Sequence, residues 1–318
     1  MAFNYAITVK NEIIPFLSPQ IKGILANLND KDYTKLEEIR LRYGQPLILR
    51  IGDKEFSVSS QGNLVTDIYK GYRVDEVDLA RTLASISDNS LYAFEEDIKR
   101  GFITVPGGHR VGLAGQVILE KNRIKKIKDF SSICFRVARE IKNCAIPLMP
   151  LIWPNKSQKI SNTLIISPPR CGKTTILRDL ARILSSGHYF NSAKNVAIID
   201  ERSELAGSYR GIPQLDVGPR TDVLDACPKS LGMIMAIRSL SPEVIVTDEI
   251  GRKEDVDAIA ECVNAGVSVI SSIHAQDLEE LSCRPVMREL MGIRAFEIGV
   301  VLSRKNGPGT ISETIRWD

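Results

Sequence analysis

Residues 163–175 read Thr-Leu-Ile-Ile-Ser-Pro-Pro-Arg-Cys-Gly-Lys-Thr-Thr, an apolar run that leads into a loop with two prolines and a glycine. The end of this stretch fits the phosphate-binding (Walker A) pattern G-x-x-x-x-G-K-S/T, with Ser167 in place of the first glycine and Gly172, Lys173 and Thr174 at the expected spacing. A strand before such a loop and a helix after it gather backbone N–H groups and the positive helix end around an anion. The stretch therefore predicts a phosphate-binding loop between a strand and a helix.

The residues of this loop are expected to bind a nucleotide together. The Lys173 ammonium is expected to reach the β- and γ-phosphates, and the Thr174 hydroxyl is expected to bind Mg²⁺. The sequence has no Asn-Lys-x-Asp motif of the kind that reads guanine, so ATP is favoured over GTP. The predicted nucleotide-binding residues are Ser167, Pro168, Pro169, Arg170, Cys171, Gly172, Lys173, Thr174 and Thr175.

Three further apolar runs end in side chains that suit phosphate chemistry. One run ends in Asp248 and Glu249, another in Asp200 and Glu201, and a third in His274. Because the carboxyl ends of parallel strands meet at one edge of a sheet, we expect these side chains beside the phosphate loop. Asp248 is expected to hold Mg²⁺, Glu249 to polarise the attacking water and His274 to sense the γ-phosphate. The alternatives are that Asp248 and Glu249 only cap the following helix, and that His274 is an ordinary structural or surface histidine.

Short apolar runs alternate with helical patterns through the second half of the chain. The runs lie at 163–166, 195–199, 244–246 and 267–270, and the helical patterns at 173–186, 228–240 and 254–265. Buried strands that alternate with helices predict a parallel sheet with helices on both faces. The predicted fold class is therefore α/β, a P-loop NTPase core of the RecA-like kind. A loop is expected over 206–226, near a ring pore or a partner.

The first half of the chain mixes element types and predicts a smaller α+β domain. Strands are expected at 38–42, 46–51, 101–105, 109–117 and 132–137, and a helix over 75–98. Several prolines and a polar stretch predict a linker over 143–162. The expected division is an amino-terminal α+β domain at 1–150 and a P-loop ATPase domain at 151–318.

Composition excludes several classes of protein. The 318 residues carry 42 basic and 39 acidic side chains, so the net charge of +3 does not point to nucleic acid as a main partner. The six cysteines form no C-x-x-C pair and there are only three histidines, so a clustered metal site is not expected. Apolar runs fall short of the roughly 20 residues that span a bilayer. A cytoplasmic protein is expected.

Several boxes of the second half resemble the ATPases of type II and type IV secretion systems. Residues 238–250 resemble the Walker B region of that family, 271–277 its histidine box and 199–205 its acidic box. The boxes follow in family order across 163–277. Asp248 stands where many secretion ATPases have glycine. How Asp248, Glu249 and the Asp200–Glu201 pair share the binding of Mg²⁺ therefore stays open.

The resemblance implies a homo-hexameric ring ATPase that uses ATP and Mg²⁺. Arginines of the amino-terminal domain reach ATP phosphates in such rings, and the matching candidates here are Arg110 and Arg136. The candidate catalytic residues are then Glu249, Glu201, Lys173, His274, Arg110 and Arg136, and the candidate metal ligands are Thr174 and Asp248.

The loop 167–174 and the stretch 94–116 resemble a sporulation branch of the family more closely still. This resemblance implies a motor on the mother-cell side of the forespore that energises a secretion-like channel. Its partners would be membrane proteins of a sporulation channel complex, with membrane contact only through them. Two other hypotheses remain: a nucleic-acid-dependent P-loop motor, and a nucleotide-gated assembly scaffold with little turnover.

Overall fold

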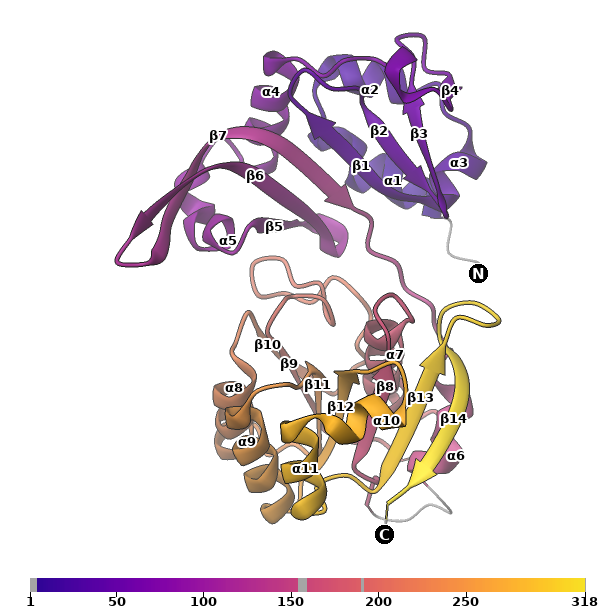
Figure 1. The fold of residues 1–318 in the computed structure, drawn as a ribbon, viewed down its shortest axis with the longest axis vertical. Coiled ribbons are helices and arrows are strands. Elements are labelled where there is room, and N and C mark those ends of the chain that lie inside the picture. Colours follow the sequence, from indigo (N-terminus) through magenta and orange to yellow (C-terminus); the bar gives the residue numbers. More distant parts are fainter. Residues whose placement is uncertain (1–4, 154–158, 190–191, 318) are drawn as a thin grey trace. The chain divides into compact units, whose positions relative to one another are not determined.

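The computed structural model describes residues 5–153, 159–189 and 192–317, and the chain divides into two compact units at 1–139 and 140–318. Each unit contains its own seven-stranded sheet (Figure 1). Among the described residues, the first unit has one hydrophobic core cluster and the second has two. The division lies before the predicted boundary at residue 150.

The predicted linker over 143–162 is wrong for its described amino-terminal part. Ala145, Leu148, Met149, Ile152 and Trp153 are all buried in the core of the second unit. Pro147 and Pro150, two of the prolines that suggested a linker, instead lie in the first turns of two short helices, η5 (Ile146–Leu148) and α6 (Met149–Ile152), where a missing N–H costs nothing. Residues 154–158 lie outside the described residues.

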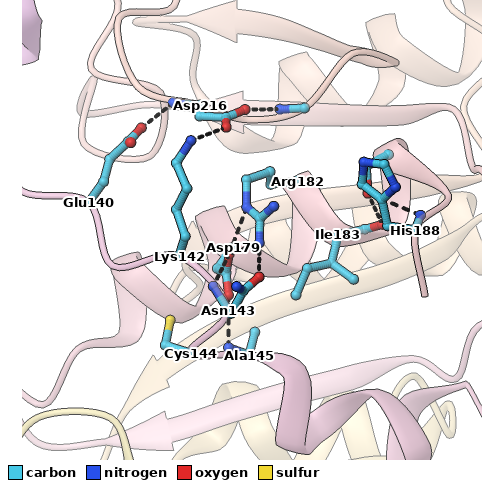
Figure 2. Close-up of polar contacts among 12 residues, drawn as sticks. Glu140, Lys142, Asn143, Cys144, Ala145, Asp179, Arg182, Ile183, His188 and Asp216 are labelled. Carbon is cyan, nitrogen blue, oxygen red and sulfur yellow. Dashed lines mark hydrogen bonds and ion pairs between the residues drawn. The ribbon is translucent and has the colours of Figure 1, made fainter. Parts of the chain in front are cut away.

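Residues 140–145 are fixed to the second unit by a set of polar contacts around one buried carboxylate (Figure 2). Asp179, on helix α7 (Lys173–Ser186), accepts the backbone N–H groups of Asn143 at 3.0 Å and Ala145 at 2.9 Å. Arg182, one turn further along α7, donates to Asp179 Oδ1 and to Asn143 Oδ1, each at 2.8 Å. The segment that enters the second unit is thus bound to the helix that begins at the phosphate loop.

The first unit is an antiparallel sheet covered by helices. Its helices are α1 (Tyr5–Glu12), η1 (Ile14–Phe16), α2 (Pro19–Leu25), α3 (Asp30–Lys35), η2 (Ile68–Lys70), α4 (Glu76–Ile86), η3 (Leu91–Phe94), α5 (Glu95–Lys99) and η4 (Pro106–Gly108). Its strands are β1 (Leu36–Arg42), β2 (Ile48–Ile51), β3 (Lys54–Val58), β4 (Leu64–Val65), β5 (Phe102–Val105), β6 (His109–Glu120) and β7 (Arg123–Arg136), in the order β4-β3-β2-β1-β7-β6-β5. Alternate residues such as Ile39, Leu41 and Phe135 are buried in the core, which leaves the opposite face of the sheet polar.

The single helix predicted over 75–98 is wrong in its middle. A reciprocal capping box between Asp75 and Asp78 starts α4 as the pattern requires. Asp88 and Asn89 then adopt positive φ angles of 48° and 61°, which no helix continues through. The apolar spacing carries on past this break, but into the separate short helices η3 and α5.

The second unit is a mostly parallel sheet with helices on both faces, as predicted. Its strands are β8 (Thr163–Ser167), β9 (Val196–Asp200), β10 (Thr221–Asp225), β11 (Val244–Glu249), β12 (Ser268–His274), β13 (Ile298–Ser303) and β14 (Thr310–Arg316), in the order β10-β9-β11-β12-β8-β13-β14. Only the β13–β14 pair among these strands is antiparallel. Along β8, Ile165 packs into one core with α7, whereas Leu164 and Ile166 pack into the other.

The second core contains residues of α8 (Lys229–Ser239), α9 (Lys253–Asn264), α10 (Leu278–Cys283) and α11 (Pro285–Gly292). The strands predicted at 163–166, 195–199, 244–246 and 267–270 correspond to β8, β9, β11 and β12, and the helices predicted at 173–186, 228–240 and 254–265 to α7, α8 and α9. The loop expected over 206–226 is corrected at its end, because β10 adds a parallel edge strand beside β9.

Candidate functional site

The phosphate loop connects β8 to α7 through two residues in left-handed backbone conformations. Arg170 has a φ of 61° and Gly172, at the N-cap of α7, has a φ of 88°. Gly309, in the turn between β13 and β14, donates its N–H to the Cys171 carbonyl at 2.8 Å. A Cβ on Gly172 would lie 3.1 Å from the Gly309 nitrogen. The glycine that the motif requires is therefore needed for its φ angle and for the space beside a distant turn.

Gly172→Ala is expected to lower the free energy of unfolding more than Gly266→Ala does. Both glycines have positive φ angles, but a Cβ on Gly266 meets nothing within 4 Å. The left-handed conformation alone costs an alanine about 1 kcal/mol, and Gly172→Ala adds the displacement of Gly309. Urea unfolding of the two variants measures the difference. Equal losses would mean that the β13–β14 turn does not constrain the loop.

Lys173 points back over its own loop. Its Nζ donates to the carbonyl oxygens of Ser167 at 3.0 Å and Pro168 at 3.2 Å, and lies 2.8 Å from His274 Nδ1. Burial lowers the pKa of Lys173 to about 8, against the opposing effect of the Glu249 carboxylate. This ammonium is poorly solvated, and a nearby anion would stabilise its charge.

His274 connects this lysine to the acidic strand end. Strand β12 lies between β8 and β11, and His274 is its last residue. The Nε2 atom of His274 lies 3.0 Å from Glu249 Oε2, while its Nδ1 faces Lys173. The structure therefore brings together three of the predicted site residues: Lys173 from the start of α7, and His274 and Glu249 from the carboxyl ends of the neighbouring strands β12 and β11.

The other acidic residues form a second group around a lysine. Asp248 is buried, and this burial, with the charges of Asp200 and Glu201, raises its pKa to about 6 although Lys229 opposes the shift. The ammonium of Lys229 forms an ion pair with Glu201 Oε2 and lies 3.2 Å from Asp248 Oδ1. Asp200 accepts the N–H groups of Glu204 and Ala206, so it orders the turn that follows β9.

The expected metal ligands are the hydroxyl of Thr174 and the carboxylate of Asp248. Thr174 lies in the first turn of α7, and the carboxylate of Asp248 is buried, with the Lys229 ammonium 3.2 Å from its Oδ1. Mg²⁺ usually takes one or two protein oxygens and completes its shell with substrate phosphates and water. A hydroxyl and a carboxylate oxygen fit that donor set. Within the described ranges no group of three or more His, Cys, Asp or Glu residues is placed to hold a metal ion by itself.

Arg110 and Arg136 lie in the first unit and are neighbours there. They face each other across the β6–β7 ladder, and Glu38 on β1 is the next residue in the same row. The Arg110 guanidinium stacks over the Phe102 ring at 3.9 Å, and Arg136 is exposed. The same polar face of the sheet carries Arg40, Arg42 and Arg50 at alternating positions. The two predicted arginines thus belong to an arginine-rich sheet face.

Sequence reasoning missed three residues of the site. Lys229 follows a proline at the start of α8, a place where lysines are ordinarily solvated, so nothing in the sequence marks it as buried. Arg252 lies 3.9 Å from Glu201, and Gly309 lies against the phosphate loop. These contacts join residues that are far apart in the chain and match no spacing rule.

None of the helices in the described residues has the length and hydropathy of a membrane-spanning segment.

Comparison with known proteins identifies the family. Residues 8–316 match the family described as "Sporulation stage III, protein AA". The chain is 43% identical over 304 residues to "Stage III sporulation protein AA" of Bacillus subtilis (strain 168), which covers 95% of this chain and 94% of that protein. It is also 32% identical over 174 residues to "Uncharacterized protein ycf45" of Cyanidium caldarium, across 54% of this chain and 48% of that protein.

Solved structures share the fold at low identity. The ATPase DotB of Legionella pneumophila superposes with a TM-score of 0.55 and 15% identity, over 86% of this chain and 73% of DotB. The pilus retraction motor PilT, solved with bound ADP, gives a TM-score of 0.54 and 15% identity, over 84% of this chain and 74% of PilT. The fold is thus that of the P-loop secretion ATPases, and the chain belongs to the family "Sporulation stage III, protein AA".

Proposed function

We propose that this protein is an ATP-hydrolysing ring motor that energises a secretion-like channel between mother cell and forespore during sporulation. The observation that carries this proposal is the chain of contacts from Lys173 through His274 to Glu249 at the edge of the parallel sheet. Transfer of a phosphoryl group to water needs a positioned cation and a carboxylate that orients the water. The likeness to a sporulation protein and to the folds of secretion ATPases supports the cellular role.

In this proposal the loop 167–175 holds the phosphates and Lys173 neutralises them. Glu249 accepts a proton from the attacking water. His274, bonded to both Lys173 and Glu249, senses the γ-phosphate by exchanging its lysine contact for a phosphate oxygen. Glu201 is a second catalytic carboxylate. Thr174 and Asp248 would hold Mg²⁺, which when bound neutralises phosphate charge.

The proposed assembly is a homo-hexamer in the mother-cell cytoplasm. Its partners are membrane proteins of a sporulation channel complex, and it contacts the membrane only through them. Arg110 and Arg136 are assigned to the phosphates of ATP bound by a neighbouring copy, because a guanidinium spreads its charge over two phosphate oxygens.

The first test is ATP hydrolysis by the purified protein over a range of concentrations, beside Lys173→Ala. Specific activity that rises with protein concentration and disappears in the variant supports a ring whose sites need neighbours. Tight ATP binding without hydrolysis would favour the assembly scaffold instead. Stimulation by single-stranded DNA that falls with salt would favour the nucleic-acid-dependent motor.

Mixing inactive variants tests whether the arginines act between copies. Arg136→Ala and Lys173→Ala are each expected to be inactive alone. Suppose that each site takes its loop from one copy and its arginine from the next. In an equimolar mixture half of the loops have Lys173 and half of the neighbouring copies have Arg136, so about a quarter of the sites are complete and turnover returns to about a quarter of the wild-type value. The mixture is unfolded and refolded together before assay. Activity that stays at the background level would assign Arg136 to its own copy or to no phosphate.

The affinity for ATP is expected to fall as pH rises above about 8. The pKa of Lys173 is lowered to about 8 by burial, and the bound phosphates require its ammonium form. Above that pH, binding must also return a proton, which costs up to about tenfold in affinity per pH unit. Equilibrium binding of a fluorescent ATP analogue between pH 7 and 9.5 measures this slope. Lys173→Met should bind weakly without it, and a flat wild-type profile would contradict the assignment.

A further inference from the structure

Lys229, the first residue of α8, is a buried ammonium in acidic surroundings. Its side chain is 7% exposed, and it contacts Glu201 Oε2 and Asp248 Oδ1. Withdrawing an ammonium from water is costly unless charged partners surround it. Here the partners come from the carboxyl ends of two neighbouring parallel strands, since Glu201 directly follows β9 and Asp248 lies in β11.

The lysine joins these strand ends at a level where their backbones are not paired. The ladder between β9 and β11 ends at Ile199 and Thr247. Glu201 and Asp248 both lie beyond it, so the backbone bonds between β9 and β11 do not fix their separation. The Lys229 side chain provides that connection, with the buried Asp248 as one anchor and the half-buried Glu201 as the other.

The second ion pair of Glu201 is much weaker. Arg252 approaches Glu201 Oε1 at 3.9 Å, and its side chain is 74% exposed. A long, solvated side chain at that distance restricts its partner little. The orientation of the Glu201 carboxylate therefore depends on Lys229.

We propose that Lys229 is a positioning residue for hydrolysis, which holds the Glu201 carboxylate in place while Asp248 anchors the lysine. This inference rests on the proposed ATPase function. A lysine with only a structural role would neutralise the buried Asp248 and the half-buried Glu201, and its loss would leave the turnover of bound ATP unchanged in a folded protein. A positioning lysine lowers kcat through Glu201 and leaves KM for ATP nearly unchanged. The two roles thus differ in a measurable quantity.

The test compares Lys229→Met, Lys229→Arg and the control Lys253→Met. Lys253 is the exposed first residue of α9 and so matches Lys229 in its place on a helix. Lys229→Met is expected to lower kcat about 10–100-fold, as loss of a supporting partner commonly does, with KM for ATP changed less than about threefold. Lys229→Arg, which keeps the charge, should recover much of the loss, and Lys253→Met should match wild type.

The double variant Lys229→Met/Glu201→Gln separates positioning from folding. A neutral pair of similar size replaces the Lys229–Glu201 ion pair, so only Asp248 loses its cation and this variant is expected to be more stable than Lys229→Met alone. If Lys229 acts through Glu201, the double variant turns over ATP nearly as fast as Glu201→Gln alone. A folded Lys229→Met with wild-type kcat, or a full further loss in the Glu201→Gln background, would overturn the inference while leaving the ATPase assignment intact. Absence of hydrolysis in the wild type would overturn both.

Discussion

Glu249→Gln is expected to bind ATP with nearly wild-type affinity and to hydrolyse it at least about a hundredfold more slowly. The Oε2 atom of Glu249 lies 3.0 Å from His274 Nε2. An amide of the same shape keeps an acceptor for the imidazole N–H, so the site should keep its arrangement. It cannot take a proton from water, however, and so removes the step that the carboxylate serves.

Turnover and equilibrium binding must be measured on the same preparation. The matched control is Glu254→Gln, which removes a carboxylate from an exposed position in the first turn of α9. This control should behave as wild type in both assays. Turnover at the wild-type rate by Glu249→Gln would remove Glu249 from the catalytic residues, and a parallel loss of ATP affinity would mean that it holds the nucleotide instead.

Lys173→Ala is expected to abolish measurable hydrolysis and to weaken ATP binding by about a hundredfold or more, since the charge-assisted hydrogen bonds that we assign to Lys173 and the phosphates would be lost. This variant should nevertheless be no less stable than wild type. Burial holds the pKa of Lys173 near 8, below its ordinary value of 10.5, so the folded state disfavours the ammonium. Between these two pH values the unfolded chain binds the additional proton, and wild-type stability therefore rises with pH in this window.

Thermal unfolding across pH 7–10.5 measures that slope in the wild type and in Lys173→Ala, where it should be smaller. Lys253→Ala, which removes an exposed lysine, serves as control and should keep the wild-type slope. A large loss of stability in Lys173→Ala at neutral pH would show that the contacts of Lys173 with Ser167 and Pro168 stabilise the fold. It would contradict the view that the ammonium is destabilised until an anion binds.

The sequence predicted those parts of the fold and of the candidate site that depend on contiguous motifs or on single apolar runs. The pattern around Gly172 and Lys173 is contiguous, and the apolar runs that end in Glu249 and His274 are buried strands of a parallel sheet, so their ends had to meet. Lys229 escaped prediction because its burial depends on two carboxylates that only the folded sheet brings to it.

Two of the fold predictions that failed have related physical causes. Strand β10 is a half-buried edge strand with acidic residues at two of its five positions, and no apolar run marks it. Pro147 and Pro150 suggested a linker, but proline suits the first turn of a helix as well as it suits a linker, and here both prolines lie in first turns. In each case the residue type suited two structures, and packing against the second unit's core decided between them.

The contacts in Figure 2 also limit which backbone angles are free near the division between the two units. Up to Arg139 the chain is tied to the first unit, through bonds from Val137 to Glu37 and from Arg139 to Leu36, each at 2.9 Å. From Asn143 it is tied to α7 through Asp179. Residues 140–142 lie between these two sets of bonds, so a change in backbone direction between Arg139 and Asn143 would have to be absorbed by the φ and ψ angles of these few residues.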